Sequence, residues 1–253
     1  MRAPLLLLTL VLAFTMATKK TSAQPAGQSV QKLDVKISRT VTTHFLLALP
    51  KDYDAKAAKR WPLMMFLHGA GERGADLSKV AIHGPPKLVA AGQELPFIIV
   101  SPQCPGGERW SDDTLLALLD SVSTQHHVDT NRIYLTGLSM GGFASWSLAA
   151  KYPERFAAVA PICGGGSTID LLLTSKTKRD AIKTLPIWAF HGTKDTAVPL
   201  AESEKMVAGF KHAGCQQAEL TVYPDAGHDS WTETYSNPKL YEWFLSHTRA
   251  VAK

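Results

Sequence analysis

A serine between two glycines, standing where a strand pattern changes into a helix pattern, constrains this fold most. Residues 137–141 (GLSMG) fit G-x-S-x-G; the apolar run Arg132–Thr136 precedes them, and helical spacing over Met140–Lys151 follows. A turn this sharp strains the serine backbone and leaves room only for glycine beside it. We therefore expect Ser139 Oγ to stand above a sheet, beside a helix N-terminus that favours negative charge. The alternative is a glycine-rich turn without chemistry.

Strand and helix patterns alternate along the rest of the chain. An opening antiparallel pair is expected first, followed by continuous apolar runs typical of strands buried on both faces. The expected strands are Val30–Ile37, Thr42–Leu49, Trp61–Leu67, Phe97–Val100, Arg132–Thr136, Phe156–Ile162, Pro186–Phe190 and Glu219–Tyr223; the further helices are Leu115–His126, Glu202–His212 and Pro238–His247. This order predicts an α/β fold, with a mostly parallel central sheet and helices on both faces. With no Gly-, Ser- or Pro-rich linker after residue 30, we expect one domain over residues 30–250.

The N-terminus is typical of a secretory signal peptide. Arg2 precedes the apolar run Leu5–Met16, and small residues stand before Gln24, so we expect cleavage near Ala23 and a secreted or periplasmic protein. The apolar run is short for a membrane span, and an uncleaved anchor is the alternative. Residues 1–23 hold three basic residues and no acid, so the net charge of +5 becomes +2 without them. This small charge, without a basic stripe or known binding module, predicts no nucleic-acid partner.

The cysteines and the basic cluster point to no further site. Cys104, Cys163 and Cys215 allow at most one disulfide, and no Cys/His group has metal-ligand spacing, so no metal is expected. The cluster at residues 176–179 (KTKR) is interpreted as a solvated loop.

A serine nucleophile needs a base, and the base needs a carboxylate to orient it. His228 lies in a loop after the last expected strand, and Asp195 follows the core strand Pro186–Phe190. Asp170 and Asp225 are rival acids, but neither follows so apolar a strand. The order Ser139, Asp195, His228 is that of the α/β-hydrolases.

An oxyanion hole completes such a site. Residues 68–74 (HGAGERG) follow the strand Trp61–Leu67, and we assign the two backbone donors to Ala70 and Met140. We interpret His68 as organising this loop rather than as a second base. Trp110 and Trp231 lie near the expected site loops, where they would either stack on substrate or pack beneath the loops.

Five motifs carry a resemblance over Leu33–His247: HGAGERG, SPQCP at residues 101–105, GLSMGG, HGTKDTAVP at residues 191–199 and AGHDSW at residues 226–231. The chain resembles the α/β-hydrolase superfamily, especially its carboxylesterase and feruloyl or acetylxylan esterase-like branch. The phospholipase/carboxylesterase and dienelactone hydrolase groups are similar too, although a dienelactone hydrolase usually carries a cysteine nucleophile where this chain has Ser139.

The resemblance implies a cofactor-free serine esterase that forms an acyl-enzyme. Only 22 residues, 164–185, separate two expected strands where many lipases insert a lid, so we expect no large lid. An open site suits short acyl groups or feruloyl and acetyl esters on polysaccharides. After signal cleavage no stable membrane insertion is expected. One alternative is a serine peptidase of prolyl-oligopeptidase-like type, although we expect no room in this chain for the N-terminal propeller of those enzymes. The other alternative is a non-catalytic binding protein on the same fold.

Overall fold

The computed structural model describes residues 29–249, which contain a seven-stranded sheet in the order β1-β3-β2-β4-β5-β6-β7. β1 runs antiparallel to β3, and all other neighbours are parallel. The strands are β1 (Phe45–Ala48), β2 (Trp61–Leu67), β3 (Ile98–Pro102), β4 (Val128–Leu138), β5 (Ala158–Ile162), β6 (Ile187–Gly192) and β7 (Ala218–Tyr223). The helices are α1 (Gly84–Ala90), α2 (Asp112–Gln125), α3 (Met140–Lys151), α4 (Ile169–Leu172), α5 (Lys176–Thr184), α6 (Leu200–His212), α7 (Trp231–Ser236) and α8 (Pro238–Leu245), with 3-10 turns at Leu77–Ile82 and Pro153–Arg155.

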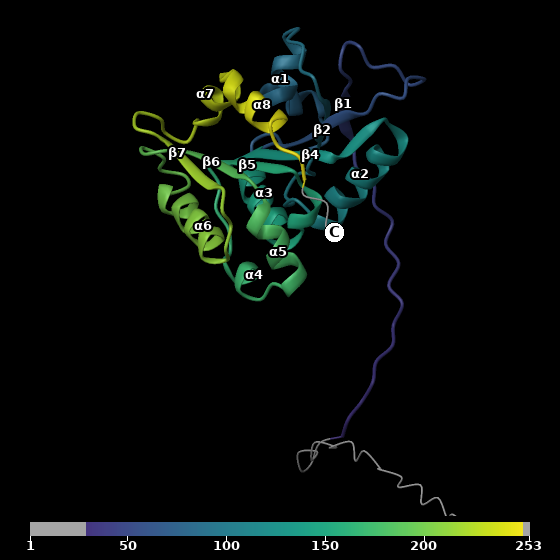
Figure 1. Cartoon of the computed structure of the whole chain (residues 1–253), viewed down its shortest axis with the longest axis vertical. Coiled ribbons are helices and arrows are strands. Elements are labelled where there is room, and N and C mark those ends of the chain that lie inside the picture. The colour runs from purple at the N-terminus through teal and green to yellow at the C-terminus, as the bar shows by residue number, and fades with distance from the viewer. Residues whose placement is uncertain (1–28, 250–253) are drawn as a thin grey trace, which may run out of the picture. The chain divides into compact units, whose positions relative to one another are not determined.

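Alternate side chains of each central strand enter different cores. In β2, Leu63, Met65 and Leu67 pack into one apolar cluster, while Met64 and Phe66 pack into another on the opposite face of the sheet. Residues of α2, α3, α5 and α6 cover the first cluster, and residues of α1, α7 and α8 cover the second. Figure 1 shows these groups of helices on opposite sides of the sheet. The predicted α/β architecture, with helices on both faces, is confirmed.

The site lies where the chain changes direction in the sheet. From β2 the chain first adds β3 on one side and then returns to place β4 on the other. Leu67 therefore pairs with Gly137, and the loop after β2 lies beside the turn after β4. Crevices form at such switch points, outside the carboxyl ends of the strands.

Two local predictions were wrong. Val30–Ile37 forms no strand, and its apolar side chains are 66–88% exposed, because no neighbouring strand pairs with it. Residues 29–40 fall in a unit of their own, whereas residues 41–249 lie in a second, compact unit. The cluster at residues 176–179 is helical and exposed except at Lys178, which is half-buried. It opens α5, whose N-cap Ser175 accepts a hydrogen bond from Lys178 N–H.

In the described range, no helix has both the length and the apolar character needed to cross a bilayer. The expected signal peptide lies outside the described residues.

Candidate active site

The turn between β4 and α3 holds Ser139 in a strained backbone conformation. Its φ of 51° and ψ of −115° are unusual for a residue with a side chain and cost on the order of 1–3 kcal/mol. The Ser139 N–H donates to Ile162 O at 3.0 Å, which ties the turn to β5. A methyl group at Gly141 would lie 2.0 Å from the Leu67 carbonyl oxygen, and one at Gly137 would lie 2.6 Å from Gly141. The glycines are therefore required by close backbone contact, as the motif predicted.

Three side chains from separate loops meet in a continuous hydrogen-bonded relay. Ser139 Oγ lies 3.0 Å from His228 Nε2, and His228 Nδ1 lies 2.7 Å from Asp195 Oδ2. With the hydrogen on Nδ1, His228 donates to the carboxylate and its Nε2 accepts from the serine hydroxyl. The structure thus brings together the three residues that the sequence singled out, and the arrangement can carry a proton from serine to imidazole.

The carboxyl group of Asp195 is held ionised. Burial alone would raise its pKa, but the hydrogen bond from His228 and those from the Val198 and Ala197 amides lower the pKa below its ordinary value. The two amides donate to Oδ1 at 2.8 and 2.9 Å, which leaves Oδ2 to face His228. This fixes both the charge and the orientation of the group behind the imidazole.

Ser139 opens onto a pocket of about 420 Å³ lined by Ala70, Met140, Phe143, Arg73 and Arg109. Met140 is the first residue of α3, so its N–H has no partner within the helix and lies in the positive end of the helix dipole. Both expected oxyanion donors, Ala70 and Met140, therefore border the same space as the serine. The two arginines make this pocket cationic.

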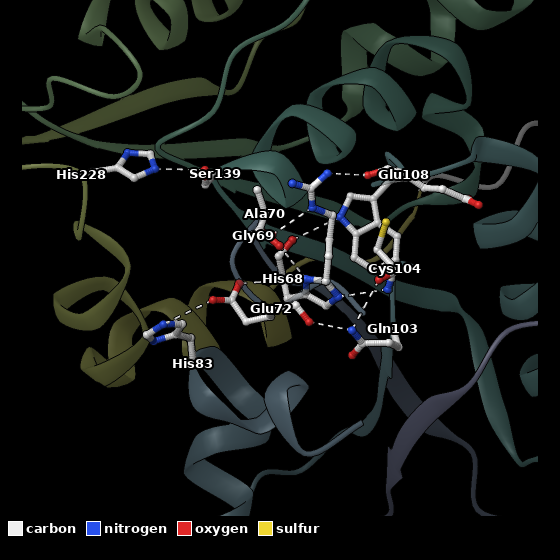
Figure 2. A network of polar contacts seen from close by, with 12 residues as sticks. His68, Gly69, Ala70, Glu72, His83, Gln103, Cys104, Glu108, Ser139 and His228 are labelled. Atoms are coloured by element: carbon white, nitrogen blue, oxygen red, sulfur yellow. Dashed lines mark hydrogen bonds and ion pairs between the residues drawn. The ribbon is translucent and has the colours of Figure 1, made fainter. Parts of the chain in front are cut away.

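A polar network underlies the loop that carries Ala70 (Figure 2). His68 is buried; its Nδ1–H donates to Gly69 O at 2.7 Å, and its Nε2 accepts from Cys104 N–H at 3.0 Å. Burial lowers the pKa of His68, so this imidazole is neutral and joins the loops after β2 and β3. Arg73 Nε–H donates to Ala70 O at 2.9 Å. These bonds support the interpretation that His68 organises the loop.

A comparison with protein families gives a match over a region that contains both the turn with Ser139 and the loop with His228. The family model described as "Dienelactone hydrolase family" matches residues 105–242, more than half of the chain. The chain belongs to the dienelactone hydrolase family.

Several esterases are similar to this dienelactone hydrolase family member. The bifunctional acetylxylan esterase/xylanase XynS20E of Neocallimastix patriciarum is 26% identical over 192 residues, which cover 72% of this chain and 26% of that protein. A solved structure described as a thermostable esterase is 33% identical, with a TM-score of 0.65, and the match covers 81% of this chain and 59% of that one. A ferulic acid esterase shares the fold at 20% identity and a TM-score of 0.57, over 78% of this chain and 89% of that one.

The chain spans from about a quarter to less than half the length of the first curated relatives that it matches. Likeness to those proteins therefore bears on the hydrolase fold and on the family, and their full activities are considered below as proposals.

In this dienelactone hydrolase family member, serine and not cysteine occupies the turn. All three cysteines are free and buried. The rival acids lie elsewhere: Asp225 is 91% exposed and pairs with Lys194 at 2.8 Å, and Asp170 is on α4. Asp195 is therefore the carboxylate that the fold brings to His228.

The two tryptophans, Trp110 and Trp231, pack against residues of the candidate site. Trp110 Nε1–H donates to His68 O at 3.2 Å, and its ring centroid lies 4.8 Å from the His68 ring. Trp231 meets the His228 ring edge-on at 5.3 Å and lies 5.4 Å from His83. Trp110 packs under the Ala70 loop, and Trp231 packs against the imidazole that contacts Ser139.

Sequence reasoning missed three residues at this site. Arg109 and Phe143 line the pocket, and His191 contacts the far side of Asp195. Phe143 could have been found, because it lies in the first turn of the helix that follows the serine. His191 follows a core strand in the HGTKDTAVP motif, yet only the folded chain shows which atoms its ring meets.

Proposed function

We propose that this chain is a serine esterase that hydrolyses carboxylic esters through an acyl-enzyme. The relay from Ser139 through His228 to Asp195, opening onto the pocket that Ala70 and Met140 border, carries the proposal. Membership of the dienelactone hydrolase family and similarity to esterases support it.

In the proposed mechanism, Ser139 Oγ attacks the ester carbonyl carbon while His228 Nε2 takes the hydroxyl proton. The carbonyl oxygen becomes an oxyanion that accepts hydrogen bonds from the Ala70 and Met140 N–H groups. Asp195 holds the proton on His228 Nδ1 and stabilises the imidazolium. His228 then gives its proton to the leaving alcohol. In the second half of the reaction, water attacks the acyl carbon while His228 takes a proton from it, and His228 returns this proton to Ser139 Oγ as the acid leaves.

Short acyl groups, or feruloyl and acetyl esters that decorate polysaccharides, are the substrates we propose. The pocket of about 420 Å³ is small, and the segment between β5 and β6 holds only the short helices α4 and α5. An acetylxylan esterase and a ferulic acid esterase are among the similar proteins, which supports the same substrate class. Secretion, expected from the N-terminal residues, would bring the enzyme to such polymers.

The test is hydrolysis of p-nitrophenyl acetate, butyrate and octanoate, methyl ferulate, acetylated xylan and a peptide p-nitroanilide. Ser139→Ala should lower kcat at least 10³-fold. Ser145→Ala is the matched control: Ser145 lies on the same helix, buried, and bonds only to Gly141 O among the described residues.

Ester hydrolysis that falls with chain length and depends on Ser139 would support the proposal. Anilide cleavage in preference to esters would replace it with a peptidase. Binding of ferulate or xylan without Ser139-dependent turnover of any substrate would favour a binding protein.

A further inference from the structure

Ala70, one of the two expected oxyanion donors, lies in a stretch of backbone with little to hold it in one conformation. Glycines stand on both sides of it, Gly69 and Gly71, and Ala70 itself is exposed. Glycine gives the chain a wide choice of φ and ψ. A methyl group on Gly71 would meet nothing within 4 Å, so the loop is open at that point. A donor that must point at one oxygen therefore needs support from outside this tripeptide.

The peptide unit that carries the Ala70 N–H is held by His68. Gly69 C=O and Ala70 N–H belong to the same unit, which is trans, so the two groups point in opposite directions. His68 Nδ1–H donates to Gly69 O at 2.7 Å, and its Nε2 accepts from Cys104 N–H at 3.0 Å. A backbone N–H can only donate and a carbonyl oxygen can only accept, so these contacts settle the tautomer. The bond to Gly69 O fixes the direction in which the Ala70 N–H points.

The next peptide unit, which carries the Ala70 carbonyl, is held by Arg73. Its Nε–H donates to Ala70 O at 2.9 Å, and its Nη1–H donates to Glu108 O at 3.0 Å (Figure 2). A guanidinium group carries only donors in a rigid planar fork, so both roles are certain and both bonds have fixed geometry. Arg73 thus ties the carbonyl of Ala70 to a second loop, the one between β3 and α2.

That second loop is anchored on both sides of Glu108. Before it, the Cys104 N–H donates to His68, and Cys104 O accepts from the Gly74 N–H at 3.0 Å. After it, Trp110 Nε1–H donates to His68 O at 3.2 Å. The carbonyl of Glu108 is therefore a fixed point to which Arg73 can hold the exposed loop.

We propose that Arg73 is a positioning residue of the oxyanion hole, which keeps the Ala70 N–H directed at the substrate carbonyl oxygen while Ser139 attacks. With Gly69 O and Ala70 O both held, the backbone of Ala70 is fixed on both sides, and the donor is preorganised before negative charge develops. The inference rests on the proposed esterase function for its kinetic consequence, whereas the restraint on the Ala70 backbone is independent of that function.

A second arginine allows the hold on Ala70 to be separated from the effect of charge. Arg73 and Arg109 both line the pocket onto which Ser139 opens. Both bonds of Arg73 go to uncharged carbonyl groups, and it forms no ion pair among the described residues. No hydrogen bond joins Arg109 to Ala70. Removal of either arginine takes one positive charge from the pocket, but only removal of Arg73 releases Ala70.

The direct test is the motion of the Ala70 amide, read by ¹⁵N relaxation of alanine-labelled protein with the signal assigned by Ala70→Ser. We expect an order parameter of about 0.85 in the unaltered protein and in Arg109→Ala, and below about 0.6 in Arg73→Ala, on the picosecond-to-nanosecond timescale. Arg73→Lys keeps the charge but has one nitrogen in place of the fork, so it should resemble Arg73→Ala. The other alanine signals show whether each variant is folded. A rigid Ala70 in folded Arg73→Ala would overturn the proposal, whether or not the protein hydrolyses esters.

The kinetic test is kcat and KM for p-nitrophenyl acetate. A misplacement of about 1 Å can cost about 10²-fold in rate, so Arg73→Ala and Arg73→Lys should each lower kcat about 10²-fold, with KM within about threefold of the unaltered enzyme. Arg109→Ala shares the loss of charge, and its kcat should stay at least about tenfold above that of Arg73→Ala. Dilute guanidinium chloride should restore part of the kcat of Arg73→Ala, and sodium chloride at the same concentration should not.

The outcomes separate this proposal from the proposed function. Equal losses of kcat in Arg73→Ala and Arg109→Ala, without rescue by guanidinium, would mean that Arg73 acts through its charge alone and would refute its positioning role. An unaltered protein that hydrolyses no ester would refute the esterase function, and the relaxation measurement would still decide whether Arg73 holds Ala70.

Discussion

Replacing Asp195 by asparagine should trap His228 in the wrong tautomer, because the surroundings dictate which way the amide points. The Val198 and Ala197 N–H groups both donate to the Oδ1 position, so the asparagine oxygen must stay there. The amide NH₂ then occupies the Oδ2 position, 2.7 Å from His228 Nδ1. Nδ1 becomes an acceptor, Nε2 carries the hydrogen, and His228 can no longer take the Ser139 proton.

We expect kcat/KM for p-nitrophenyl acetate to fall about 10⁴-fold, or about 5.5 kcal/mol of transition-state stabilisation. Asp225→Asn is the matched control: it makes the same chemical change at a 91% exposed side chain of the histidine loop, in a surface ion pair worth less than about 1 kcal/mol. Its rate should stay within about twofold of the unaltered enzyme.

Stopped-flow or steady-state release of p-nitrophenol, with thermal unfolding to show that Asp195→Asn is folded, decides the matter. If the folded Asp195→Asn variant keeps more than a tenth of the activity, the relay through Asp195 does not orient the base and the reasoning is wrong.

Three further predictions concern backbone contact, acid stability and thiol reactivity. Gly141→Ala would place a methyl group 2.0 Å from the Leu67 carbonyl oxygen, so it should lower the free energy of unfolding, measured in urea, by at least about 3 kcal/mol. Gly106→Ala is the control, because its methyl group would meet nothing closer than 3.9 Å, and it should change the free energy of unfolding by less than about 0.5 kcal/mol. Equal effects of the two substitutions would contradict the close-contact argument. Because the folded pKa of Asp195 lies below its ordinary value of 3.8, this group stabilises the fold above that pH, and the stability is lost as the pH falls through the folded pKa. Urea titrations from pH 6 to pH 3 should therefore show a smaller loss of unfolding free energy for Asp195→Asn than for the unaltered protein. Equal losses would contradict a lowered pKa at Asp195. Burial raises the pKa of the Cys163 thiol to about 12, so this thiol should resist a disulfide reagent at pH 8 and react once the protein is unfolded in guanidinium. Comparing Cys163→Ser with the unaltered protein identifies the signal of Cys163. Rapid labelling of Cys163 in the native protein would refute the prediction.

Patterns of local origin were enough to predict most of the architecture. A continuous apolar run predicted β2 with the bounds that the structure shows, and helical spacing predicted α3 from Met140 to Lys151, again as observed. The glycine spacing around Ser139 reports a backbone constraint that the sequence carries directly. The short helices α1, α4 and α7 were missed because fewer than eight residues give too little periodicity to recognise.

The failure at Val30–Ile37 has a different cause. Alternating apolar residues show only that a strand could form, and pairing needs a neighbouring edge in space. The strand β1 instead pairs with β3, from which it is separated by about fifty residues of chain.

The serine turn and the order of serine, acid and histidine can be predicted without a structure, because they depend on residue type, spacing and the local strand-to-helix change. Three contacts emerge only in the folded chain. Asp195 and not Asp170 or Asp225 meets His228, Trp110 packs beneath the Ala70 loop, and His191 contacts the far side of the Asp195 carboxylate. Those contacts join loops far apart in the chain, and their distances are set by how the strands align at one edge of the sheet, which no local pattern encodes.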